Sequence, residues 1–310
     1  MKTSMYRFQS AIAAIALVAV LTSCKKSDDD TPAMDSKNIV QVASSDNQFS
    51  ILAAAVTKAG LASTLSGPGP FTVFAPTNDA FNKLFAKLGV SGLNDLSAET
   101  LKPILLNHVI SGNIKAADIT TGYVATMNNT GPAQNKVKVF ILKGANVTVD
   151  GSKVIIADVM ASNGTIHAVD NVIMPASVVG QAINNPMFSI LVQAVVKAKL
   201  VDALSAAGPF TVFAPTNDAF NALFTKLGVT GISDLTAAQL TPILLYHVVP
   251  ANVLASQVTT GIVPTLKDGS TISVMADAMG VKLNNSAKVI ATDVQGTNGV
   301  VHAIDAVLIP

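Results

Sequence analysis

The chain contains one fourteen-residue stretch twice, without a single difference. "GPFTVFAPTNDAFN" occupies Gly69–Asn82 and recurs at Gly208–Asn221. The two copies start 139 residues apart. A spacing this long is typical of a duplicated domain, because the units of a solenoid are only about 20–50 residues long. The repeat therefore predicts two similar domains, residues 37–175 and 176–310. Two further pairs of segments align downstream: "PILLNHVI" (Pro103–Ile110) with "PILLYHVV" (Pro242–Val249), and "NGTIHAVDNVIMP" (Asn163–Pro175) with "NGVVHAIDAVLIP" (Asn298–Pro310).

Each repeat begins with helical patterns and ends with strand patterns. Apolar residues recur at helical spacing after Asp46 and after Asn185, and these two residues are expected to cap the helix. The fourteen-residue stretch predicts a short strand closed by a proline and then a second helix, capped by Asn78 or Asn217. Because helices come first and strands follow, each domain is expected to be α+β, with the sheet packed on its helices.

The first 23 residues have the layout of a secretory signal peptide. Lys2 and Arg7 precede the apolar run Ala11–Leu21, which is too short to span a bilayer as a helix. The run leads into "LTSC", which resembles the lipobox of bacterial lipoproteins, so Cys24 is predicted to carry the lipid anchor. The alternative is an ordinary signal peptide in which this cysteine is incidental. Residues 24–36 are polar and aperiodic, and they are predicted to form a flexible tether.

Charge and composition argue against nucleic acid as a partner. The chain has 20 Lys and Arg against 19 Asp and Glu, and loss of the signal peptide leaves one acidic group in excess. Arg7 is the only arginine, so the mature chain has no guanidinium group for phosphates or base edges.

The acidic "SDDD" after Cys24 resembles a surface-export signal of lipoproteins in one group of Gram-negative bacteria. We therefore expect an outer-membrane lipoprotein, either surface-exposed or facing the periplasm.

Three segments together resemble the fasciclin domain family. "TVFAPTNDAF", "LLYHVV" and "NGVVHAIDAVLIP" occur in this order in the second repeat, and close variants occur in the first. The resemblance implies two tandem domains, each a β-sandwich wedge with helices gathered at one side. Family members are mostly secreted or surface-anchored proteins of adhesion, matrix binding or cell–cell contact. The family's tyrosine–histidine segment is linked to receptor binding in animal relatives, which makes Tyr246 and His247 candidate partner-binding residues. The first repeat has Asn107 in place of the tyrosine.

The four histidines are the other candidates for chemistry, and they pair off across the repeat as His108 with His247 and His167 with His302. In "HAVD" and "HAID" the His and Asp are three residues apart, so in a strand they point to opposite faces. Apolar neighbours surround every histidine, which is typical of buried imidazoles bound to backbone groups. Serine-nucleophile and phosphate-loop signatures are missing. The sequence thus predicts no catalytic residue, no cofactor and no metal site.

Two functions remain open at this point. The first is a lipid-anchored adhesion or interaction module of the cell envelope that binds a protein or a polysaccharide. The second is a periplasmic structural or scaffold lipoprotein without an external ligand. A hydrolase or metal-dependent enzyme is a distant third, because the sequence offers no constellation of residues for it.

Overall fold

The computed structural model describes residues 37–310. The expected signal peptide, Cys24 and tether all lie outside these residues. No helix between residues 37 and 310 is long and apolar enough to cross a membrane.

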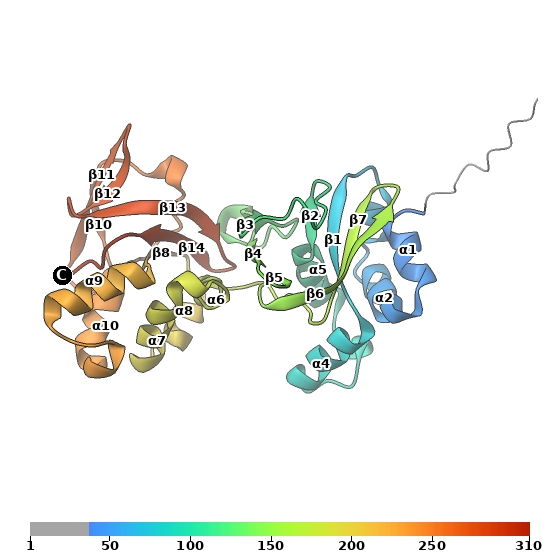
Figure 1. Cartoon of the computed structure of the whole chain (residues 1–310), viewed down its shortest axis with the longest axis horizontal. Coiled ribbons are helices and arrows are strands. Elements are labelled where there is room, and N and C mark those ends of the chain that lie inside the picture. The colour runs from blue at the N-terminus through green and yellow to red at the C-terminus, as the bar shows by residue number, and fades with distance from the viewer. Residues whose placement is uncertain (1–36) are drawn as a thin grey trace, which may run out of the picture. The chain divides into compact units, whose positions relative to one another are not determined.

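The chain forms the same series of elements twice, blue to yellow-green and then yellow to red in Figure 1. The helices and turns of the first unit are α1 (Ile39–Ser45), η1 (Asn47–Phe49), α2 (Ser50–Lys58), α3 (Ala62–Ser66), α4 (Asn78–Leu88), η2 (Leu93–Asp95), α5 (Ala98–Asn107) and η3 (Pro132–Gln134). Its strands are β1 (Phe71–Pro76), β2 (Val109–Ser111), β3 (Gly122–Ala125), β4 (Lys138–Lys143), β5 (Val147–Val149), β6 (Ser152–Ala161) and β7 (Gly164–Val169).

The second unit repeats this order, except that η6 precedes its third strand whereas η3 follows the third strand of the first unit. Its helices and turns are α6 (Val178–Asn184), η4 (Pro186–Phe188), α7 (Ser189–Lys197), α8 (Val201–Ser205), α9 (Asn217–Leu227), η5 (Ile232–Asp234), α10 (Ala237–Tyr246) and η6 (Ala255–Gln257). Its strands are β8 (Phe210–Pro215), β9 (Val248–Val249), β10 (Gly261–Pro264), β11 (Thr271–Asp277), β12 (Gly280–Leu283), β13 (Ala287–Gln295) and β14 (Gly299–Ile304).

Each unit has one seven-stranded sheet built around a parallel pair of strands. The order in the first unit is β2-β1-β7-β6-β5-β4-β3, and β9-β8-β14-β13-β12-β11-β10 is its equivalent in the second. The pairs β1–β7 and β8–β14 are parallel, while the other strand pairs are antiparallel. Gly164 and Gly299 start β7 and β14 so close to the carbonyls of Phe71 and Phe210 that any side chain would collide. This close approach explains the repeated "NG" of the sequence.

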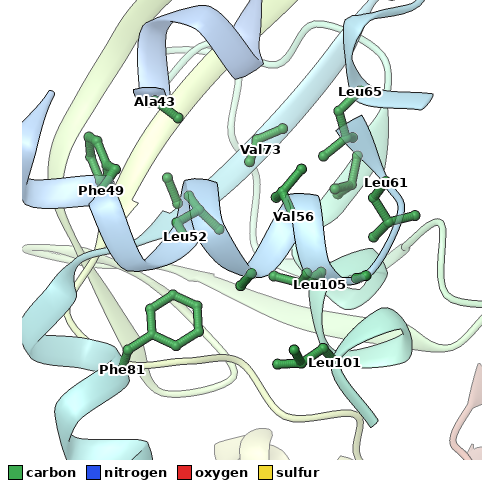
Figure 2. Close-up of a cluster of buried hydrophobic side chains, with 14 of the residues drawn as sticks. Ala43, Phe49, Leu52, Val56, Leu61, Leu65, Val73, Phe81, Leu101 and Leu105 are labelled. Carbon is green, nitrogen blue, oxygen red and sulfur yellow. The ribbon is translucent and has the colours of Figure 1, made fainter. Parts of the chain in front are cut away.

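Two hydrophobic layers cover the two faces of the parallel pair in the first unit. Val73 and Ala75 of β1 face the helices, where Phe49, Leu52 and Leu105 pack against them (Figure 2). Phe74 points the other way, into a second cluster with Ile141 of β4 and Val149 of β5. All six positions of β7 are buried. The expected α+β class, a wedge of sandwiched sheet with helices at one side, is confirmed.

The cap of the helix in the repeated stretch differs from the sequence prediction. Asn78 and Asn217 were expected to cap α4 and α9, but Thr77 and Thr216 are the N-cap residues. The Thr77 hydroxyl accepts the N–H of Ala80 at 3.3 Å, while the threonine backbone keeps an extended conformation suited to a cap. The asparagine prediction was therefore wrong by one residue.

Asn78 instead ties two helices together. Its Oδ1 accepts the backbone N–H of Ile51 at 3.0 Å, and its Nδ2 donates to the carbonyl of Asn47 at 2.9 Å. Asn217 makes the same two bonds with Ile190 and Pro186. One carboxamide thus binds a donor in α2 and an acceptor in the turn η1 that leads into it. The fourteen residues therefore fix both the corner between β1 and α4 and the position of α2 beside that corner.

One other local prediction can be compared with the structure. Asp46 and Asn185 cap the turns η1 and η4, which lead directly into α2 and α7, so the expected caps act one turn earlier than the helix itself. Helix α5 continues through Pro103 without a restart. The helices of the repeated stretch end at Gly89 and Gly228, both in the left-handed region at φ of 68° and 69°.

We predict that Asn78→Ala and Asn217→Ala destabilise the domains that contain them. Each substitution leaves a backbone N–H and a carbonyl without their partner, which should cost about 1–2 kcal/mol. Urea unfolding of residues 37–310 measures the loss. Asn82→Ala and Asn221→Ala are matched controls, because these two asparagines are exposed on the same helices. An equal loss in the control variants would contradict the tie.

Candidate functional site

His167 and His302 are buried in the middle of the sheet and are held by backbone groups. Nδ1 of His167 accepts the N–H of Asp158 at 3.2 Å, and Nε2 lies 2.9 Å from the carbonyl of Ile114. His302 makes the equivalent contacts with Asp293 and Val253. One donor and one acceptor fix each ring as the neutral Nε2–H tautomer. Burial lowers the pKa of His302, which also favours its neutral form.

His108 and His247 lie at the ends of α5 and α10 and are also fully engaged. Nδ1 of His108 lies 2.7 Å from the carbonyl of Ile104, and Nε2 accepts the N–H of Ile173 at 2.8 Å. His247 binds Ile243 and Leu308 in the same way. Burial lowers the pKa of both rings to about 4. These histidines therefore fasten the last segment of each repeat to the helix layer in their neutral form.

Within residues 37–310, the histidines are not grouped with other possible metal ligands. Asp170 accepts the N–H of Lys153 at 2.8 Å, and Asp305 accepts that of Lys288 at 2.7 Å, so both carboxylates of the "HAVD" and "HAID" motifs bind the backbone of the adjacent strand. Over residues 37–310, no three His, Cys, Asp or Glu side chains gather closely enough to hold a metal ion. The structure brings each motif histidine next to backbone rather than next to its sequence partner.

Tyr246 is buried beside His247, with exposed fractions of 5% and 2%. Its hydroxyl donates to the carbonyl of Thr271 and accepts from Nδ2 of Asn284, both at 2.8 Å. Neither side chain is therefore available at the surface for direct contact with a partner. Their role as partner-binding residues stays a prediction, and the structure shows what they do inside the domain.

The first repeat has a less satisfied polar pair at the same place. Asn107 replaces Tyr246, and Asp150 stands where Asn284 stands, because each accepts the backbone N–H of the matching strand residue, Phe140 or Ser273. Among residues 37–310, Oδ1 of Asn107 and Oδ2 of Asp150 find no hydrogen-bond partner. Burial raises the pKa of Asp150 to about 7, against the opposing bond from Phe140. This feature could have been suspected from the repeat, since the tyrosine and its amide partner are lost together.

A contact surface that the sequence did not predict joins β3 and β4 to the helix α6. The Tyr123 hydroxyl donates to the carbonyl of Gln181 at 2.9 Å, and Nε2 of Gln181 donates to the carbonyl of Lys138 at 2.6 Å. The Tyr123 ring packs on Phe140 with their centroids 4.9 Å apart and also contacts the hydrophobic core of the second unit. Burial raises the pKa of Tyr123, and the charge of Asp150 adds to this shift. We call this surface the seam.

A cavity of about 450 Å³ lies in the seam. Tyr123, Phe140 and Leu142 line one side, and Asn185, Pro186 and Met187 line another. Tyr123 and Lys138 are the titratable residues that line this cavity, and most of the other lining residues are apolar, so it offers a place for an apolar or weakly polar group.

Exposed apolar side chains gather on β6. Its pairing with β7 is irregular between Val154 and Val159, so two consecutive isoleucines point outward. Ile155 is 47% exposed, Ile156 is 41% exposed and Met160 on the same strand is 55% exposed. We call these three residues the β6 patch. Adjacent exposed apolar residues of this size are typical of interaction surfaces.

A fasciclin domain family model matches residues 47–175 and 186–310. Protein sll1483 of the cyanobacterium Synechocystis is 40% identical over 174 residues, which is 56% of this chain and 93% of that protein. Human periostin is 29% identical over 255 residues, 79% of this chain but only 29% of periostin, so the chain spans less than a third of that relative. A solved domain pair of the insect cell adhesion molecule Fasciclin I covers 87% of this chain and 96% of its own, at 22% identity and a TM-score of 0.47.

We predict that His247 makes the second domain less stable in acid. Its pKa is about 4 in the folded protein against 6.5 for a free imidazole, so the unfolded chain takes up the proton first. The stability contributed by the neutral ring is complete above pH 6.5 and is lost as the pH falls toward 4. At about 1.4 kcal/mol per pKa unit the loss is on the order of 3 kcal/mol.

Urea midpoints between pH 4 and 7 measure this effect in the wild type and in His247→Ala. The variant should be less stable at pH 7, by about 1–3 kcal/mol, and should lose less stability on acidification. Asp150 acts in the opposite sense, because its raised pKa removes stability as the pH rises toward 7, and both proteins share it. Equal pH dependence in the two proteins, or a fall in midpoint on adding a chelator, would overturn the structural role of the histidine.

Proposed function

The chain belongs to the fasciclin domain family, and we propose that it is a lipid-anchored adhesion or interaction module of the cell envelope. Fasciclin domains are implicated in adhesion, and the insect protein with the related domain pair is a cell adhesion molecule. The proposed partner is a protein or a polysaccharide on a cell surface or in a matrix.

The burial of the four histidines is the observation that supports this proposal. All four, and Tyr246, are buried and bound inside the fold, so the residues that distinguish the family motifs are not exposed. A partner must therefore bind to side chains that the fold leaves outside. The β6 patch is the surface that we propose for this contact, because its apolar side chains are exposed without serving either hydrophobic core.

The proposed location is the outer membrane, held by acyl chains on Cys24. The stretch before residue 37 would then connect the lipid to the first domain, as a tether of about a dozen residues. A periplasmic scaffold with the same anchor is the competing function, and it differs in having no external partner.

We predict that labelled residues 37–310 bind to envelope or matrix preparations through the β6 patch. The double variant Ile155→Lys/Ile156→Lys should bind roughly tenfold more weakly, because charges replace the apolar centre of the contact. Leu88→Lys/Leu227→Lys is the matched control, since both leucines are exposed on helices of the two domains. Treating the preparation with protease or with periodate tells a protein partner from a polysaccharide.

Equal binding of the patch variant and the wild type would show that another face is used. Absence of wild-type binding to every preparation would contradict the interaction function and favour the scaffold.

We also predict that Cys24→Ser moves the full-length protein from the membrane fraction to the soluble fraction. A single acyl chain binds membranes with an association constant of only about 10⁴ M⁻¹, so stable anchoring requires more than one chain on this residue. Ser23→Ala keeps a small residue before the cysteine and should leave the protein in the membrane. Protease treatment of intact cells then reports the side, because only a surface-exposed protein is cleaved. A serine variant that stays in the membrane pellet would contradict the anchor.

A further inference from the structure

The seam between the two domains gives a pattern that can be searched for elsewhere in the molecule. On one side lies the edge of the first sheet, where Tyr123 of β3 pairs with Phe140 of β4. On the other side lies α6, whose Gln181 binds the Tyr123 hydroxyl through its carbonyl and Lys138 through its side chain. The edge strands β3 and β4 of one domain thus dock the first helix of the next.

The second domain carries the same sheet edge, and apolar side chains are exposed along it. Ile262 of β10 pairs with Ser273 of β11, as Tyr123 pairs with Phe140, so Ile262 occupies the tyrosine's position. Ile262 is 73% exposed, and Met275, two residues beyond Ser273 on the same face, is 40% exposed. Met279 in the adjoining turn is 89% exposed. We call Ile262, Met275 and Met279 the β10 edge.

The first domain, in turn, carries the matching helix, α1. Ile39 of α1 and Val178 of α6 donate their backbone N–H to Asn163 and Asn298 in the same way, both at 2.9 Å, which aligns the two helices. Val42 therefore stands where Gln181 stands. It is only partly buried, whereas Gln181 is fully buried in the seam.

The β10 edge and helix α1 form two open surfaces, and the residues on them differ from those of the seam in a matched way. The seam joins a tyrosine to a glutamine, and the open surfaces carry Ile262 and Val42 at these positions. Both polar partners are thus replaced by β-branched apolar side chains, which suit a dry contact. A hydroxyl or amide on one side alone would instead lose its partner on docking.

The charged positions show the same exchange. Beside Tyr123 the seam has a carboxylate on the sheet side, Asp150, and a carboxamide on the helix side, Asn185. The equivalent positions on the open surfaces are Asn284 on the sheet side and Asp46 on the helix side, each capping the same turn as its counterpart. Docking would therefore again place one carboxylate and one carboxamide around the docked side chain, and not two carboxylates.

We propose that the β10 edge of one molecule docks helix α1 of a second copy of this chain, in the manner of the seam. The contact is head-to-tail, since the two surfaces belong to different domains and are not the same patch. Repetition of such a contact gives open chains of molecules. Self-association by this route does not require the external partner proposed above, so the two ideas can fail separately.

Disulfide trapping tests this contact directly. Cys24 is the only cysteine, so residues 37–310, which contain both hydrophobic cores of each domain, have no thiol of their own. Ile262→Cys and Val42→Cys, one of them carrying a mass tag, are mixed and oxidised. Docking raises the local thiol concentration, and the mixture should give roughly tenfold more mixed disulfide dimer than Leu227→Cys paired with Val42→Cys. Ser45→Cys, exposed at the end of α1, replaces Val42→Cys if that variant does not fold.

Sedimentation of the unmodified fragment over a concentration series gives a second measurement. The average mass should rise with concentration, and Ile262→Asp should remain a monomer, because it places a charge on the β10 edge at a site exposed enough to leave the fold intact. Mixed dimer no more abundant than with the Leu227→Cys control would overturn the proposal. So would a monomeric wild type at every concentration, or an Ile262→Cys homodimer that forms in preference to the mixed dimer.

Discussion

Burial of both faces of the parallel strand pair is the constraint on which each domain depends. Parallel strands cannot be joined by a tight turn and are stable when both of their faces are covered. Here β1 and β7 come from distant parts of the repeat and align over their full length. Helices α2 and α5 cover one face, and the strands β4 and β5 fold over the other. The residues that achieve this are the ones that the two repeats share.

This constraint explains why the repeats agree where they do and differ elsewhere. Thr77, Asn78 and His108 each satisfy a backbone group that would otherwise be left unpaired around the buried pair. Changing one of them costs stability in either domain. At the seam and the β10 edge the repeats differ, with Tyr123 against Ile262 and Phe140 against Ser273. Several of the differences between the repeats therefore lie at these two surfaces.

The sequence predicted the elements and the class of fold well, because strand and helix periods are local. It also predicted the backbone-bound histidines from their apolar neighbours. It missed the role of Asn78 since the bonded residue, Ile51, lies on another helix. Thr77 and Asn78 both favour caps, and only the backbone geometry separates them. The seam was beyond local reasoning, because Gln181 meets Lys138 across the domain junction and neither residue belongs to a family motif.

Native-state hydrogen exchange tests whether the motif histidines serve the fold. The backbone N–H of Ile173 is bound to His108 and that of Leu308 to His247, both close to the ends of their repeats. We expect these two amides to exchange only when their domain unfolds, with the same free energy as the β1 and β8 amides. Their protection should not change when Zn²⁺ is added. Rapid exchange of Ile173 and Leu308 at neutral pH, or a change in their protection on addition of Zn²⁺, would contradict this role of the histidines.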